Sequence, residues 1–319
     1  MHHRAYPPIT DANQNRAAEG LRVIEDYCRF YLQHKTLTDK SALLRKRIHK
    51  IMPQSLAQLQ IRDTHKDQRA KEPPTPRKNS RDLLTANFKR VTEALRVLEE
   101  YTSNAAYNEL RYDCYELEKN VLLQAAKPSI NTGIYLISAD PDILKKGLTW
   151  GVSLIQYRDN SASKEQIYNV CKELKPLAQK AKTPMIVNNF LDIALLLDAD
   201  GFHSGQDDLD VDKQRQLLGD HKLIGKTSHN IQQGKKAQAQ GADYVSVGPI
   251  WETPSKPGRK AIGFDYLKIA QAQLNIPYVA IGGIENKERF DQVQHYHPPM
   301  IGIVRAAEEL PAWLAKNNS

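Results

Sequence analysis

Short runs of apolar and β-branched residues alternate with amphipathic segments from Gly133 onward. Such runs are typical of parallel strands buried on both faces, with helices as the crossovers between them. Because these crossovers are right-handed, eight strand–helix units can close into a barrel. The runs are residues 133–138, 152–158, 184–189, 201–205, 222–228, 244–250, 277–284 and 300–306. We therefore predict an α/β fold with a TIM (β/α)8 barrel over residues 131–319. An open doubly wound sheet is the alternative, disfavoured because no Gly-x-Gly-x-x-Gly follows the first run.

The first 130 residues have a different pattern and contain an internal repeat. The skeleton Ala-Asn-x-x-Arg-x-x-Glu-x-Leu-Arg-Val-x-Glu-x-Tyr begins at Ala12 and again at Ala86, an offset of 74 residues. Both copies have an apolar stripe at helical spacing, and Asp11 and Thr85 are suitable N-caps. The stripes comprise Ala17, Leu21, Ile24, Cys28 and Tyr31 in the first copy and Val91, Leu95 and Leu98 in the second. With further helical segments at 43–51 and 110–123, we predict an all-α domain over residues 1–130.

The polar face of the repeat admits two interpretations. Asn, Arg, Glu, Arg and Glu recur at intervals of three residues from Asn13 and from Asn87, so neighbouring charges can pair along each helix. Alternatively, the repeated asparagines and arginines supply donors for an anion such as phosphate, which residues 62–64 could help to bind. The sequence leaves both interpretations open.

Composition and charge restrict the partners and the cellular setting. Residues 1–132 carry 23 Lys and Arg against 16 Asp and Glu, which accounts for +7 of the net charge of +8. No nucleic-acid-binding motif accompanies this charge, so nucleic acid is not expected as a partner. Cys28, Cys114 and Cys171 form no Cys-x-x-Cys pair, and no run approaches the roughly 18 apolar residues of a membrane span. We expect a cytoplasmic protein without a membrane partner, and a homo-oligomer remains open.

Polar side chains follow the ends of the predicted strands, which meet at one rim of a TIM barrel. They include no nucleophile–base pair and no His/Cys zinc cluster, whereas their hydroxyls, amides and cations suit phosphate groups. The turn Gly282-Gly283 and the pair Val304-Arg305 follow strands seven and eight, where barrels commonly bind phosphate. Asp208, with an amide oxygen of Asn188 or Asn189, could hold a hard cation such as Mg²⁺.

The order and spacing of these residues resemble the thiamine-phosphate synthase family over about residues 133–310. The resemblance is carried by residues 155–159, 187–189, 199–209, 241–250, 253–256 and 279–284. It implies a TIM-barrel transferase that joins hydroxymethylpyrimidine diphosphate to hydroxyethylthiazole phosphate with Mg²⁺. In the family's chemistry diphosphate leaves first, and the thiazole nitrogen then attacks the pyrimidine-methyl cation.

The resemblance also implies a role for each site residue. Arg158, Lys256 and Thr227 would be catalytic, and Asp208 and Asn189 would occupy the metal positions. The pyrimidine diphosphate would contact Gln156, Arg158, Asn188, Thr227 and Lys256. The thiazole phosphate would contact Thr253, Ser255, Gly283, Val304 and Arg305.

Two positions depart from the family pattern. Asn160 occupies a substrate-binding position where the family usually has a lysine, and Asn189 occupies a metal position where it usually has an aspartate. Thr227 replaces a serine and keeps the hydroxyl. These departures keep open a thiazole-tautomerase-like barrel with His229 as the proton carrier, or a non-catalytic ligand-binding or regulatory protein.

Residues 1–130 resemble the helical domain that is fused to some members of the family. That domain is regarded as an alternative hydroxymethylpyrimidine-phosphate kinase. A kinase role rests on this resemblance, because the sequence has no Walker loop and no Gly-rich kinase loop.

Overall fold

The structure is a computed structural model that describes residues 7–51, 53, 75–254 and 258–315. The chain divides into two compact units, Met1–Ala126 and Lys127–Ser319, and each is described by itself. Among the described residues, no helix is both long enough and apolar enough to cross a membrane.

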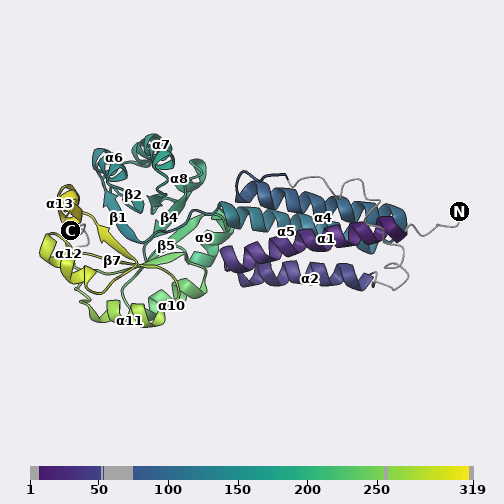
Figure 1. The fold of residues 1–319 in the computed structure, drawn as a ribbon. Coiled ribbons are helices and arrows are strands. Elements are labelled where there is room, and N and C mark those ends of the chain that lie inside the picture. Colours follow the sequence, from purple (N-terminus) through teal and green to yellow (C-terminus); the bar gives the residue numbers. More distant parts are fainter. Residues whose placement is uncertain (1–6, 52, 54–74, 255–257, 316–319) are drawn as a thin grey trace. The chain divides into compact units, whose positions relative to one another are not determined.

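The first unit consists of helices packed around one apolar core (Figure 1). Residues of the predicted stripes, including Leu21, Ile24, Leu95 and Leu98, are at most 1% exposed in that core. The described helices are α1 (Pro7–Asp26), the π-helix η1 (Tyr27–Tyr31), α2 (Lys35–Ile51), α4 (Ser80–Thr102) and α5 (Ala106–Ala126).

The predicted starts of the two repeat helices were wrong. Helix α1 extends from Pro7, so Asp11 lies inside it, and proline is well tolerated in a first helical turn. Helix α4 begins at Ser80, and the side chain of its N-cap Asn79 accepts a hydrogen bond from the Asp82 amide at 2.9 Å. Asparagine is among the best N-cap residues, so this cap sets the helix start ahead of Thr85.

Tyr31 was also misplaced, because it is 71% exposed and does not continue the apolar stripe. The prediction assumed the α-helical repeat throughout, but Tyr27–Tyr31 forms a π-helix in which hydrogen bonds span five residues. The wider turn keeps Cys28 buried and rotates the following side chains away from the core.

The polar face of the repeat forms the same ion pairs in both copies. Glu25 pairs with Arg22 on its own helix and with Arg45 of α2 at 3.0 Å. In the second copy, Glu99 pairs with Arg96 at 3.2 Å and with Arg111 of α5 at 3.3 Å. The two helical hairpins therefore repeat one electrostatic arrangement, in which a glutamate links each long helix to the next.

The repeat asparagines serve their own helices. The amide of Asn13 donates to the Ile9 carbonyl, and that of Asn87 donates to the Leu83 carbonyl, both at 2.8 Å. Arg16 and Arg90 are exposed. The second predicted anion cluster, residues 62–64, lies outside the described residues.

The second unit is a closed barrel of eight parallel strands in chain order, as predicted, rather than an open sheet. Figure 1 shows helices surrounding the strands. The strands are β1 (Gly133–Ser138), β2 (Leu154–Tyr157), β3 (Met185–Asn188), β4 (Gly201–Ser204), β5 (Leu223–Ser228), β6 (Tyr244–Val247), β7 (Tyr278–Ile281) and β8 (Met300–Ile303). The helices are α6 (Pro141–Thr149), α7 (Lys164–Ala181), α8 (Leu191–Leu196), α9 (Val211–Leu218), α10 (Ile231–Ala239), α11 (Asp265–Gln273), α12 (Lys287–Gln294), the 3-10 turn η3 (Ala307–Glu309) and α13 (Leu310–Leu314).

Alternation along the strands divides the barrel core into two layers. Outward-facing residues such as Leu136 and Val187 pack against the helices. Inward-facing residues such as Tyr135, Ile186 and Tyr244 fill the barrel interior. These side chains fill the interior of the barrel, so a site can form at the rim where the carboxyl ends of the strands meet.

The close approach of α1 and α4 generates a stability prediction. A Cβ atom on Gly20 would lie 2.7 Å from Val91 Cγ2 and 3.1 Å from the Asn87 carbonyl oxygen. Gly20→Val should therefore lower the free energy of unfolding by about 2 kcal/mol through overpacking. The control Glu19→Val adds the same side chain at an exposed neighbour and should change it by less than about 0.5 kcal/mol. Urea denaturation followed by circular dichroism compares them, and equal losses would contradict the packing argument.

Candidate active site at the carboxyl ends of the strands

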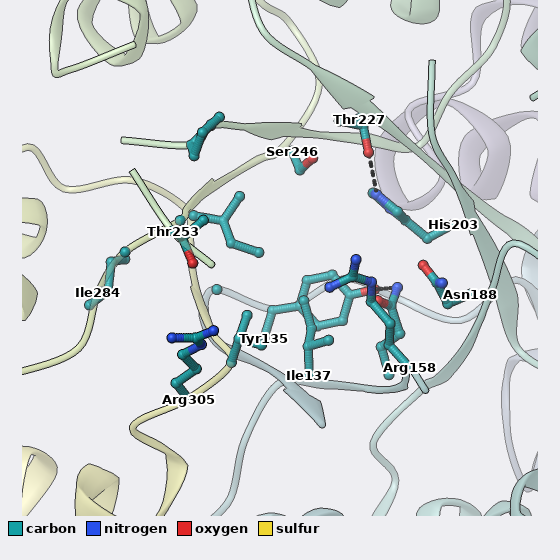
Figure 2. A pocket seen from close by; sticks show the side chains of 18 of the residues that line it. Tyr135, Ile137, Arg158, Asn188, His203, Thr227, Ser246, Thr253, Ile284 and Arg305 are labelled. Carbon is teal, nitrogen blue, oxygen red and sulfur yellow. Dashed lines mark hydrogen bonds between the residues drawn. The ribbon is translucent and has the colours of Figure 1, made fainter. Parts of the chain in front are cut away.

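A cavity opens at the carboxyl ends of the barrel strands and encloses about 1010 Å³, including its opening to solvent. Nine residues predicted from the sequence line it, drawn from six strand ends. They are Gln156, Arg158, Asn188, Asn189, Thr227, Thr253, Gly283, Val304 and Arg305. In Figure 2, Thr253, Ile284 and Arg305 lie on one side of the cavity, and Arg158, Asn188 and Thr227 lie on the other.

The two sides of the cavity each carry a cation in a different setting. Arg158 follows β2, and burial lowers the pKa of its guanidinium because desolvation disfavours the charged form. Within the part of the chain that the structure describes, no carboxylate forms an ion pair with Arg158. Arg305 follows β8, is 44% exposed and lies 3.7 Å from Glu285. Arg158 is thus the partly buried cation that an anionic ligand would neutralise.

The wall of the cavity next to Arg158 consists of buried polar groups. Gln156 is 2% exposed, and its Nε2 donates to the Tyr135 hydroxyl at 2.6 Å. Thr227 is 5% exposed, and its hydroxyl lies 3.1 Å from His203 Nε2. Their hydrogen bonds satisfy these groups inside the barrel and fix them at the edge of the cavity.

The Gly282-Gly283 turn after β7 also lines the cavity. Both glycines have positive φ, 103° and 73°, a region that other residues adopt at a cost in free energy. A Cβ on Gly282 would lie 2.5 Å from Pro249 Cα, and one on Gly283 would lie 2.6 Å from Trp251 Cβ. The turn therefore requires both glycines, and their carbonyls accept hydrogen bonds from the Trp251 amide and the Arg289 side chain.

The predicted metal positions lie in the loops after β3 and β4. Asn189 lines the cavity with φ of 59°, a left-handed conformation that asparagine tolerates. Asp208 does not line the cavity, whereas Gly205 does. The Gly205 amide donates a hydrogen bond to Asp208 Oδ2 at 2.7 Å. Among the described residues, no group of three His, Cys, Asp or Glu side chains could hold a metal ion.

The remaining predicted residues are placed differently. Asn160 is exposed in the loop after β2 and is not among the residues that line the cavity. Ser255 and Lys256 lie outside the described residues.

Sequence reasoning missed several cavity residues that lie within the strands. Tyr135 and Ile137 of β1, Ser246 of β6 and Ile281 of β7 all line the cavity. Tyr135 and Ile137 are two residues apart on one face of β1, so strand alternation applied to the predicted runs could have identified them.

The buried lysine of β5 supports the loop that carries Asp208. Lys226 is 5% exposed, and its Nζ donates to the backbone carbonyls of Asp208 at 3.3 Å and Leu209 at 3.0 Å. Gln214 of α9 donates to the same Leu209 carbonyl at 2.6 Å. The loop after β4 is therefore held from two elements.

Comparison with known proteins agrees with this geometry. A family model described as thiamine monophosphate synthase matches residues 133–306, and a model of the ThiD2 family matches residues 8–120. The thiamine-phosphate synthase of Synechocystis sp. is 38% identical over 94% of this chain and 91% of that protein. That of Thermosynechococcus vestitus is 37% identical over 93% of this chain and 89% of that protein.

A solved structure agrees on the barrel. Thiamine phosphate pyrophosphorylase from Pyrococcus furiosus aligns with a TM-score of 0.52 at 24% identity, covering 61% of this chain and all of that one. The family model spans more than half of the chain, and the two relatives match it along nearly its whole length. The chain therefore belongs to the thiamine-phosphate synthase family, whose members are transferases of thiamine biosynthesis.

Proposed function

We propose that the barrel joins hydroxymethylpyrimidine diphosphate to hydroxyethylthiazole phosphate, releasing diphosphate and forming thiamine phosphate. The observation that carries this proposal is the two-sided cavity, with Arg158 on one side, Arg305 and Thr253 on the other, and the Gly282-Gly283 turn in its lining. Two phosphorylated molecules can bind there with their reactive groups facing each other. Such placement removes much of the entropic barrier to a bimolecular reaction.

In this reaction the bond between the pyrimidine methylene carbon and the diphosphate oxygen breaks, and diphosphate leaves with the electron pair. The lone pair of the thiazole nitrogen then forms the new carbon–nitrogen bond. Negative charge grows on the diphosphate as it leaves, and we assign Arg158 to stabilise that charge. Because its guanidinium is already partly desolvated, little solvent has to reorganise as the charge develops.

Other residues would orient the two substrates. We assign Gln156, Asn188 and Thr227 to the pyrimidine substrate, and Thr253, Gly283, Val304 and Arg305 to the thiazole phosphate. We also propose that Ser255 contacts the thiazole phosphate and that Lys256 contacts the pyrimidine diphosphate.

We propose Asp208 and Asn189 as the protein ligands of Mg²⁺. The donor set fits, because Mg²⁺ prefers oxygen and is commonly bound by one or two protein ligands together with substrate phosphates and water. A bound Mg²⁺ would supply positive charge that neutralises the diphosphate. Asp208 and Asn189 follow the adjacent strands β4 and β3. The Gly205 amide donates to the Asp208 carboxylate, and the Asn189 amide donates to the His203 carbonyl.

One observation favours the tautomerase-like alternative. His229 lines the cavity, and its Nδ1 lies 2.6 Å from the Gly248 carbonyl oxygen, which can only accept. The neutral ring therefore has its proton on Nδ1 and a basic Nε2. Proton exchange into the thiazole phosphate without the pyrimidine substrate or Mg²⁺ would support that alternative.

Three further expectations stay predictions. They are a cytoplasmic location, a homo-oligomeric state, and kinase activity of the unit that matches the ThiD2 family. The three cysteines are free and buried, as a reducing compartment would allow.

Purified full-length protein with both substrates and Mg²⁺ should release diphosphate and form thiamine phosphate in equal amounts. Arg158→Gln should lower kcat/KM about 100-fold, because it removes a charged donor from the leaving diphosphate. The control Lys180→Gln removes an exposed cation in the last turn of α7 and should leave kcat/KM unchanged. An equal effect of both variants, or no diphosphate release by the native protein, would contradict the proposal.

Two adjacent carboxylates test the metal assignment. Asp208→Asn keeps an oxygen that can accept from the Gly205 amide but removes a charge, so half-maximal activity should need about 10-fold more Mg²⁺. Asp207→Asn removes the same charge from the exposed neighbour and should leave the Mg²⁺ requirement within about 2-fold. Titration of activity with Mg²⁺ compares them; matching curves would argue against Asp208 as a ligand.

Restoring the family aspartate tests the second metal position. Asn189→Asp adds a carboxylate, so the Mg²⁺ concentration for half-maximal activity should fall about 10-fold. Asn169→Asp places the same new charge at an exposed position of α7 and serves as the control. An unchanged Mg²⁺ requirement in Asn189→Asp would mean that this position does not bind metal.

A further inference from the structure

A chain of hydrogen-bonded polar side chains crosses the interior of the barrel. Gln156 Nε2 donates to Tyr135 Oη at 2.6 Å, and Tyr135 Oη lies 2.9 Å from Tyr244 Oη. His203 continues the chain, with Nδ1 3.2 Å from Tyr244 Oη and Nε2 3.1 Å from Thr227 Oγ1. All five side chains are at most 8% exposed. The chain links two polar groups of the cavity wall through three residues that have no role in the proposed reaction.

One arrangement of the protons gives every hydrogen bond in this series of side chains a donor and an acceptor. Tyr135 Oη accepts from Gln156, so the tyrosine's own proton is available for Tyr244 Oη. In this arrangement the Tyr244 proton goes to His203 Nδ1, which is unprotonated. The neutral His203 ring therefore carries its proton on Nε2 and donates it to Thr227 Oγ1. The Thr227 hydroxyl keeps its own proton to donate into the cavity.

Both tyrosines keep their hydroxyl protons in these surroundings. Burial away from solvent raises the pKa of Tyr135 and of Tyr244, so neither phenol ionises under ordinary conditions. Their rings pack edge to face, with centroids 5.8 Å apart, and the His203 ring stacks on Tyr244 at 5.5 Å. Packing and hydrogen bonding thus impose the same arrangement. Figure 2 shows the His203–Thr227 end of the chain at the cavity.

Strand β5 has a glycine, Gly225, beside the side chains of Tyr244 and His203. A Cβ on Gly225 would lie 2.2 Å from Tyr244 Cζ and 2.5 Å from His203 Nδ1. Glycine weakens a strand interior and often marks a close approach. At this position β5 lacks a side chain, and Tyr244 and His203 occupy the space.

We propose that Tyr135, Tyr244 and His203 are positioning residues that hold Gln156 and Thr227 in one fixed relation. Through them the Thr227 hydroxyl is presented to the bound substrate as a donor. The catalytic consequence rests on the proposed synthase function, whereas the direction of the hydrogen bonds does not.

Tyr244→Phe removes one hydroxyl from the chain and keeps the ring. Its matched control is Tyr266→Phe, because Tyr266 is also buried and its hydroxyl lies 2.7 Å from the Ser228 hydroxyl, in the layer outside the strands. Both variants lose one buried tyrosine hydroxyl, so a general loss of stability would affect them alike.

The first measurement uses NMR of the full-length protein labelled with ¹⁵N-histidine to determine the tautomer of His203. The His203→Gln variant, which lacks this ring, identifies its resonances. The native protein should show the proton on Nε2, and Tyr266→Phe should show the same. In Tyr244→Phe the acceptor site at Nδ1 loses its donor, so the resonance should shift toward a mixture of tautomers. A native proton on Nδ1, or an unchanged tautomer in Tyr244→Phe, would overturn the proposal.

The second measurement separates positioning from stability. Tyr244→Phe should lower kcat about 10-fold in the native background, the scale of one misdirected hydrogen bond. In a Thr227→Val background, which has no hydroxyl to orient, the same change should lower kcat by less than about 2-fold. Tyr266→Phe should leave kcat unchanged in both. Equal losses from Tyr244→Phe in both backgrounds would overturn the positioning role. Absence of synthase activity in the native protein would refute the proposed function, and the tautomer would still test the chain of hydrogen bonds.

Discussion

The hydrogen bonds between β1 and β8 determine what the barrel can do. Gly133 pairs with Met300 and Leu136 with Ile303, which closes a sheet whose first and last strands lie about half of the chain apart in sequence. In an open sheet of the same strand order, the ends of β2 and β8 would lie near opposite edges. Closure instead brings Arg158 and Arg305 to the same cavity. The two-sided arrangement on which the proposed reaction depends is a consequence of this one pairing.

The interior below the cavity shows how such a site can be held rigid. Small barrels are filled by inward-facing side chains, and most of these are apolar. Here two tyrosines, a histidine and a glutamine replace part of the apolar filling, and their hydrogen bonds partner one another. Buried polar groups are stable only when they are satisfied, so the network permits few alternative arrangements. The residues that orient Thr227 therefore come from β1, β4 and β6 rather than from its neighbours on β5.

The helical unit uses its repeat for a different purpose. Glu25 and Glu99 occupy equivalent positions, and each pairs with an arginine of its own helix and one of the following helix. Of the two interpretations of the polar face, the structure supports ion pairing for these residues. Partly exposed pairs contribute little stability individually, so the apolar core provides most of it and the pairs fix which helices are neighbours. Arg16 and Arg90 take no part in these pairs and stay exposed.

The sequence by itself determined the order and number of the strands, because a buried parallel strand must be an almost uninterrupted apolar run, but several predicted runs extend up to three residues past the observed strand ends. It also placed Arg158, Thr227 and Gly283 near the carboxyl ends of these runs, and all three line the cavity. It misjudged Tyr31 and the helix starts at Asp11 and Thr85, where a π-turn and an asparagine cap override simple periodicity.

Only the tertiary structure decided which side chains meet. The contact of Tyr135 with Tyr244 joins residues 109 positions apart, and no local pattern specifies it. Asn160 has the spacing of a site residue, yet it is exposed in the loop after β2 and does not line the cavity. Periodicity fixes the elements because it reflects local burial, whereas the network inside the barrel depends on closure and on Gly225 leaving room for its neighbours.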